Sequence, residues 1–82
     1  MVYIMLKHEH IKQEHIARKE RVQKYTYKLY VKQNKLVRLR QTIKIAVKEK
    51  ESERIIQKMR VQARQLDHYC DFLRQKIRLN TN

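Results

Sequence analysis

The last third of the chain carries an apolar pattern with helical spacing. From Ile56 to Ile77, apolar residues recur in steps of 3, 4, 3, 4, 3 and 4, with no polar residue in the series. A helix places such positions in one stripe, and an average step of 3.5 keeps the stripe facing a partner helix. The pattern therefore predicts a helix from about Glu53 to Leu79. Its packing seam consists of Ile56, Met59, Ala63, Leu66, Cys70, Leu73 and Ile77.

A seam of this length must be covered. A helix of about 26 residues spans roughly 40 Å, and an isolated helix cannot hide an apolar stripe from water. The rest of the chain must fold back over the seam, or a second chain must supply the matching face. We expect two arms packed antiparallel, with self-association into an oligomer or a larger assembly because the core of an 82-residue chain is thin.

The middle segment, residues 25–48, fits two different periods. A helical interpretation extends one heptad frame, broken only by Lys32, through Val22, Tyr25, Leu29, Leu36, Leu39, Ile43 and Ala46. This frame leaves five further apolar residues outside it, so a helix here requires a second buried face. Those residues are Tyr27, Tyr30, Val31, Val37 and Ile45.

A strand interpretation of the same segment also has support. Apolar residues occupy many odd positions from Tyr25 to Val47, whereas lysine and arginine fall mainly on even positions. Tyrosine, threonine, valine and isoleucine, which favour strands, are frequent. A β-hairpin turning at 33–35 would have one apolar and one basic face, but the segment has no glycine for its turn. The sequence leaves both interpretations open.

The most polar stretch, Glu49–Glu53, separates the two halves and is the expected joint. Ser52 is a suitable N-cap residue for the second helix. We predict a single all-α domain over residues 1–82, in which long helices form an antiparallel helical hairpin or coiled coil. Its parts are an apolar patch at 1–6, a basic arm at 8–48, a joint at 49–53 and a helix at 53–79. The patch at 1–6 is expected to pack on the seam or to start a strand. The alternative is an α+β fold with a basic β-hairpin at 25–48 between two helices.

Composition adds two constraints to this picture. The chain has no glycine and no proline, which favours long helices over folds with tight turns. It has 21 basic and 8 acidic residues, a net charge of +13, and residues 21–50 contain ten basic residues but only one acidic residue. Such a segment attracts polyanions, although a merely solvated basic face has the same composition. The predicted phosphate contacts are Arg21, Lys24, Lys28, Lys32, Lys35, Arg38, Arg40, Lys44 and Lys48.

Other residues of the chain refine the expected contact surface. Tyr25, Tyr27 and Tyr30 alternate with lysines and so have the composition of a base-stacking surface. Packing in a helix or subunit contact is the favoured role for these tyrosines. The C-terminal helix mixes acidic and basic residues, as on a self-paired solvated face, and only Lys58 and Arg60 are expected to add to a contact.

Catalytic and metal chemistry have little support in the sequence. His8, His10 and His15 lie near Glu9 and Glu14, but no HExxH motif is present and no cysteine is close. Cys70 falls on the seam and is expected to be a small buried hydrophobe. We therefore expect no enzyme, no cofactor and no metal site.

The sequence thus predicts a non-catalytic protein that contacts the nucleic-acid backbone, as an architectural or ribonucleoprotein subunit. It does not distinguish DNA from RNA. One alternative is a structural coiled-coil subunit that binds only protein, and another, less favoured, is a module on anionic membranes. A single cysteine and an apolar N-terminal run of six residues predict an intracellular location (cytoplasm, nucleus, organelle matrix or virion interior) for a chain that is neither secreted nor transmembrane.

Overall fold

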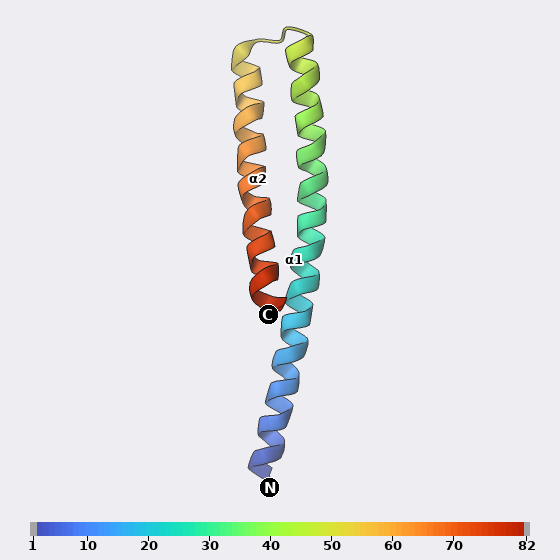
Figure 1. Cartoon of the computed structure of the whole chain (residues 1–82), viewed down its shortest axis with the longest axis vertical. Helices are drawn as coiled ribbons and strands as arrows, with labels where there is room; N and C mark the ends of the chain where they lie inside the picture. Colours follow the sequence, from blue (N-terminus) through green and yellow to red (C-terminus); the bar gives the residue numbers. More distant parts are fainter. Residues whose placement is uncertain (1, 82) are drawn as a thin grey trace.

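The protein is an antiparallel hairpin of two long helices. The computed structural model describes the backbone of residues 2–81 and the side chains of residues 13–81. Helix α1 comprises Val2–Lys48 and helix α2 comprises Glu53–Thr81, and the described residues contain no strand. The rod measures 73 × 16 × 15 Å, and α1 continues beyond the end of α2 (Figure 1). The predicted all-α hairpin is confirmed.

Residues 25–48 are part of α1, so the alternative β-hairpin does not form. A helix satisfies the backbone hydrogen bonds of this segment internally, without the glycine-containing turn that a hairpin favours. The heptad frame also faces α2: Leu36 and Ala46 are buried, and Val22, Tyr25, Leu29, Leu39 and Ile43 are half-buried. Packing against α2 therefore outweighs the β propensity of the tyrosines and β-branched residues.

Helix α1 begins earlier than expected, at Val2 and not near His8. The apolar patch at residues 1–6 was expected to pack on the seam or start a strand. The backbone of this patch is helical from Val2 onward. The expected packing falls on side chains outside the described residues. The first turns of α1 have no α2 segment beside them, because α2 ends near the level of Arg21 (Figure 1).

The seam of α2 is covered by α1 within one chain. Cys70 and Leu73 have exposed fractions of 0% and 1%, and Ile56 is also buried. The other four seam residues, Met59, Ala63, Leu66 and Ile77, are half-buried. Covering the seam therefore requires no second chain, although the five buried hydrophobic residues of the described part form only a narrow core.

The connection between the helices has defined caps. Lys50 has φ 56° and lies just after α1; the Lys50 N–H donates to the Val47 carbonyl (3.2 Å) and the Glu51 N–H to the Ala46 carbonyl (2.9 Å). This pair of bonds is a Schellman motif, which satisfies the last carbonyls of α1. The Ser52 hydroxyl accepts a bond from the Ile55 N–H (3.4 Å), which confirms Ser52 as the N-cap of α2.

Lys50→Gly is expected to stabilise the hairpin by up to about 1 kcal/mol. A left-handed conformation costs a residue with a Cβ roughly 1–2 kcal/mol, and the greater freedom of glycine in the unfolded chain cancels part of the gain. Thermal unfolding should show a midpoint up to about 4–8 °C higher. Lys48→Gly is the control, because this residue is helical and should lose about 1 kcal/mol. An unchanged or lower midpoint for Lys50→Gly would contradict the strained turn.

Candidate nucleic-acid interface

An open groove lies between the middle parts of α1 and α2. Leu39 and Leu66 of the packed seam line it, together with Thr42. Three cationic side chains from α1 and three polar side chains from α2 complete the lining, which contains no carboxylate. These six are Lys32, Lys35 and Arg38 from α1 and Gln62, Gln65 and Tyr69 from α2.

Lys32 links the seam to this groove. It occupies the one charged position of the heptad frame and is half-buried. Its ammonium nitrogen lies 5.9 Å from the centre of the Tyr69 ring, which is 38% exposed. The lysine stem covers apolar surface while the charged end reaches the ring face and water, and the cation–π attraction offsets part of the desolvation cost. Lys32 interrupts the apolar frame and thus places its ammonium group at the groove without burying the charge.

The cationic wall continues along α1 toward its N-terminus. Lys24 and Lys28 precede Lys32 by two turns and one turn, which places them along the same side of the helix, and both side chains are exposed. Among the described residues, no carboxylate forms an ion pair with the exposed cations Lys24, Lys28, Lys35 and Arg38. The name groove-side flank is used below for the cations Lys24, Lys28, Lys32, Lys35 and Arg38 together with the α2 residues that face the groove.

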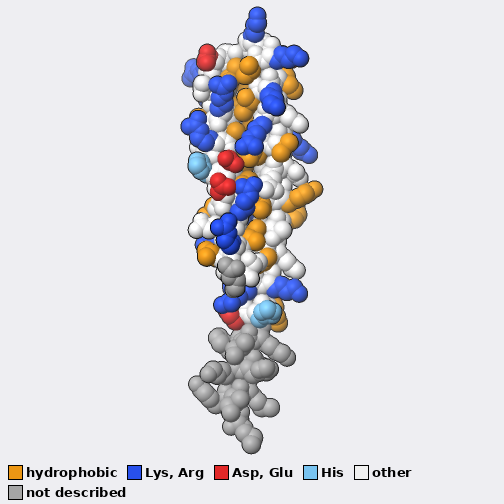
Figure 2. All heavy atoms as spheres, in the orientation of Figure 1, with side chains coloured by type: hydrophobic (Ala, Val, Ile, Leu, Met, Phe, Trp, Pro, Cys, Tyr) orange, Lys and Arg blue, Asp and Glu red, His pale blue; other side chains and the backbone are white. Residues whose placement is uncertain are grey.

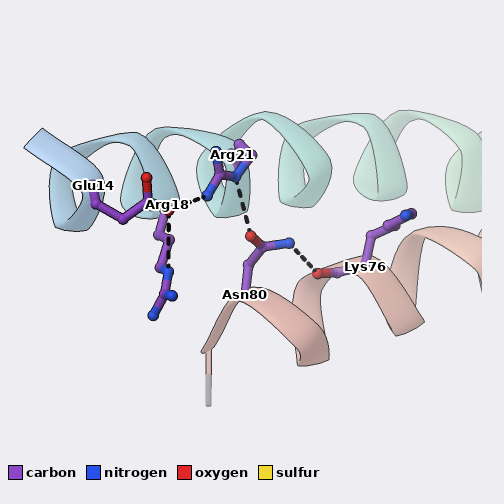
Figure 3. Close-up of polar contacts among 5 residues, drawn as sticks. All are labelled: Glu14, Arg18, Arg21, Lys76 and Asn80. Carbon is purple, nitrogen blue, oxygen red and sulfur yellow. Dashed lines mark hydrogen bonds and ion pairs between the residues drawn. The ribbon is translucent and has the colours of Figure 1, made fainter.

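Arg21, the first of the predicted phosphate contacts, is engaged within the hairpin. Its Nε donates to Asn80 Oδ1 (3.1 Å) and its Nη2 to Glu14 Oε1 (3.3 Å), as Figure 3 shows. Glu14 also pairs with Arg18 (3.5 Å), and Asn80 Nδ2 donates to the Lys76 carbonyl (2.7 Å). These contacts attach the last turn of α2 to α1. Arg21 therefore fixes the register of the helices and has less capacity for an external phosphate.

The remaining predicted cations lie on the other side of the rod. Arg40 Nη2 lies 3.8 Å from Asp67 Oδ1, and Lys44 and Lys48 follow it at intervals of four residues. At about 100° per residue, Arg40 and Lys44 project away from the groove. The nine predicted residues therefore do not form one surface. The name opposite flank is used below for Arg40, Lys44 and the α2 stripe beside them, Arg60, Arg64, Asp67, Asp71, Arg74 and Arg78.

Carboxylates distinguish this opposite flank from the groove side. Asp67 pairs with Arg40, and Asp71 accepts a 2.7 Å hydrogen bond from Arg74. These are exposed pairs that add little stability, but they lower the local positive potential. Figure 2 shows one face of the rod, where Lys and Arg side chains follow most of the described length and a few acidic side chains lie among them.

Helix α2 presents a stripe of residues beside the seam, and three of them, Gln62, Gln65 and Tyr69, line the groove. Lys58, Gln62, Gln65, Tyr69, Phe72 and Lys76 follow in steps of 4, 3, 4, 3 and 4, so they form one stripe beside the seam. The stripe contains no acidic residue, and the Lys76 ammonium lies 5.4 Å from the Phe72 ring centre. Of these residues, only Lys58 was expected to contribute. The sequence shows these residues as a stripe beside the seam. Only the position of α1 in the fold makes part of this stripe a wall of the groove.

The three central tyrosines are separated by the fold. Tyr25 is half-buried in the interface between the helices, whereas Tyr27 and Tyr30 are 70% and 65% exposed. None of them lines the groove. They therefore do not interleave with the groove-side cations, and Tyr69 of α2 is the aromatic residue that does.

Cys70 carries a free thiol that is buried in the hairpin. Burial raises the pKa of the Cys70 thiol, so it is protonated at neutral pH. No group of three potential metal ligands occurs among the described residues, and the side chains of His8, Glu9 and His10 lie outside them. Neither described helix contains an apolar stretch long enough to span a bilayer.

Comparisons with known proteins identify no relative: no protein-family model, curated protein or solved structure matches this chain.

Proposed function

We propose that this chain binds nucleic acid without catalysis, through the phosphate backbone, as an architectural or ribonucleoprotein subunit. The observation that carries the proposal is the groove-side flank. There, Lys32, Lys35 and Arg38 line a groove whose residues include no carboxylate. Arginine and lysine are the main phosphate partners in proteins, and contacts to phosphate position a protein without reading sequence. Such a role belongs in a compartment that holds nucleic acid: cytoplasm, nucleus, organelle matrix or virion interior.

The dimensions of the flank suit a row of phosphates. Lys24 and Arg38 are 14 residues apart, or about 21 Å along the helix axis. Each strand of duplex DNA carries one negative charge per roughly 3.4 Å of the duplex axis, so a strand laid along α1 has a phosphate near each cation of the flank. The amides of Gln62 and Gln65 and the hydroxyl of Tyr69 add neutral donors for phosphate or sugar oxygens.

The test is a titration of the full chain with a labelled DNA duplex and with a single-stranded RNA, repeated over a series of salt concentrations. The logarithm of the association constant should fall linearly with the logarithm of salt concentration. Five phosphate contacts give a slope of about −4 to −5 on the duplex and about −3 to −4 on the single strand. Absence of binding at low salt, or binding that is insensitive to salt, would overturn the proposal.

The second candidate is a structural coiled-coil subunit that binds only protein. The exposed apolar residues on the outer side of α1 favour it, because large exposed apolar patches mark interaction sites. The same titration separates the candidates. A protein-only subunit would leave both nucleic acids unbound and would form assemblies that persist as salt is raised.

A further inference from the structure

Helix α1 has a second apolar stripe, on the side facing away from α2. Tyr27, Tyr30, Val37 and Ile45 have exposed fractions of 70%, 65%, 52% and 55%, and Val31 is 41% exposed. These five residues, called the outer stripe below, are those that the inner heptad frame leaves out. The sequence predicted that a helix in this segment would need a second face to be buried. In the single chain, this second face is exposed to solvent.

Three of the five outer-stripe residues, Tyr27, Tyr30 and Val37, fall in heptad steps, and polar residues occupy the other two positions of the series. Tyr27, Tyr30, Asn34, Val37 and Gln41 follow in steps of 3, 4, 3 and 4, with Val31 and Ile45 beside them. From Tyr27 to Ile45 the stripe is about 27 Å long, which is enough to meet four to five turns of another helix. Apolar side chains lie at the outer, right-hand edge of the rod in Figure 2, on the side of α1. Two stripes on opposite sides explain why α1 lacks one apolar and one polar face.

The composition of the stripe is that of a binding surface. Tyrosine is enriched at protein interfaces and supplies large contact area at low entropic cost. Asn34 lies between Tyr30 and Val37 in the heptad steps and is a polar residue of the type that fixes register in coiled coils. The stripe is therefore suited to a helix with a defined alignment.

The charges around the stripe determine what kind of helix fits. Lys24, Arg38 and Lys44 border it, Lys48 follows its end, and no acidic residue occurs between positions 21 and 48. Residues that flank a coiled-coil seam set partner choice by attraction or repulsion. A second copy docked through the same face would bring these cations together. An acidic helix would neutralise them.

We propose that the outer stripe of α1 docks an amphipathic α-helix of another protein, whose apolar seam is flanked by glutamate or aspartate. The hairpin then becomes two helices of a three-helix assembly. The proposal concerns a protein partner on the outer side of α1. It shares Lys24 and Arg38 with the groove-side flank, but its test uses no nucleic acid.

The probe is a synthetic 21-residue peptide of three heptads, with isoleucine and leucine at the seam positions and glutamate at the flanking positions. Its binding to the full chain is measured by fluorescence anisotropy. Two peptides are controls: one replaces the flanking glutamates with lysine, and the other has the composition of the acidic peptide in scrambled order. We expect the acidic heptad peptide to bind at least tenfold more tightly than either control.

Variants of the chain locate the site. The double variant Tyr30→Ala/Val37→Ala should weaken binding of the acidic peptide at least tenfold, because both side chains are exposed in the free hairpin and become buried in the complex. The matched control is Val61→Ala/Leu79→Ala, which removes two exposed apolar side chains from α2 and should leave binding unchanged. Unaltered circular dichroism spectra of both variants confirm that the hairpin is folded.

Three results would overturn the proposal. Equal binding of the scrambled peptide would show that net charge alone attracts it. Equal weakening by both double variants would place the peptide elsewhere. A dimer of the chain alone in sedimentation, lost in Tyr30→Ala/Val37→Ala, would identify a second copy as the occupant of the outer stripe.

Discussion

Leu73→Ala is expected to destabilise the hairpin by about 2–5 kcal/mol. Leu73 is 1% exposed and lies on the packed seam of α2, one turn from the fully buried Cys70. Truncation removes the transfer free energy of the side chain and leaves a cavity that two straight helices close only in part. A chain of 82 residues has a free energy of unfolding of roughly 4–12 kcal/mol, so this loss is a large share of the total.

Urea unfolding followed by circular dichroism gives the difference in free energy between the variant and the parent. Leu79→Ala is the matched control, because Leu79 lies on the same helix and is 64% exposed. Its loss should stay within about 0.5 kcal/mol, as for other surface substitutions. If Leu73→Ala and Leu79→Ala unfold at the same urea concentration, the seam is not the structural core.

The second large effect concerns the groove-side flank. The quadruple variant Lys24→Gln/Lys28→Gln/Lys35→Gln/Arg38→Gln removes four exposed charges that have no ion-pair partner among the described residues. Each lost phosphate contact lowers the salt slope by about 0.9 on duplex DNA and about 0.7 on a single strand. The slope should therefore flatten by up to roughly 3 to 4 units. Thermal stability should change little, because all four side chains lie outside the core.

The matched control removes the same number of charges from the opposite flank. Arg60→Gln/Arg64→Gln/Arg74→Gln/Arg78→Gln lowers the net charge equally, but from a stripe that also contains Asp67 and Asp71. Its effect on the slope should be clearly smaller. Equal flattening by the two variants would mean that nucleic acid responds to total charge and not to the groove-side flank. No change in either would favour the subunit that binds only protein.

Much of the fold follows from local features of the sequence. The heptad steps from Ile56 to Ile77 predict α2 and its buried face, because helical spacing alone decides which side chains share a stripe. The polar stretch and the N-cap Ser52 locate the connection for the same local reason. The net charge of +13 is likewise a property of the composition. The sequence also shows that the five residues of the outer stripe do not fit the inner frame of α1.

The tertiary structure decides what two competing local patterns leave open. Residues 25–48 fit both a helix and a strand, and contact of Leu36 and Ala46 with the α2 seam selects the helix. The pairing of the helices also divides the basic residues between two sides: Lys35 faces Gln62 and Tyr69 across a groove, whereas Arg40 faces Asp67. These assignments depend on the rotation and register of one helix against the other. Residues close together in the sequence do not determine this rotation and register. Helix packing and the hydrogen bond between Arg21 and Asn80 set them only when the chain has folded back on itself.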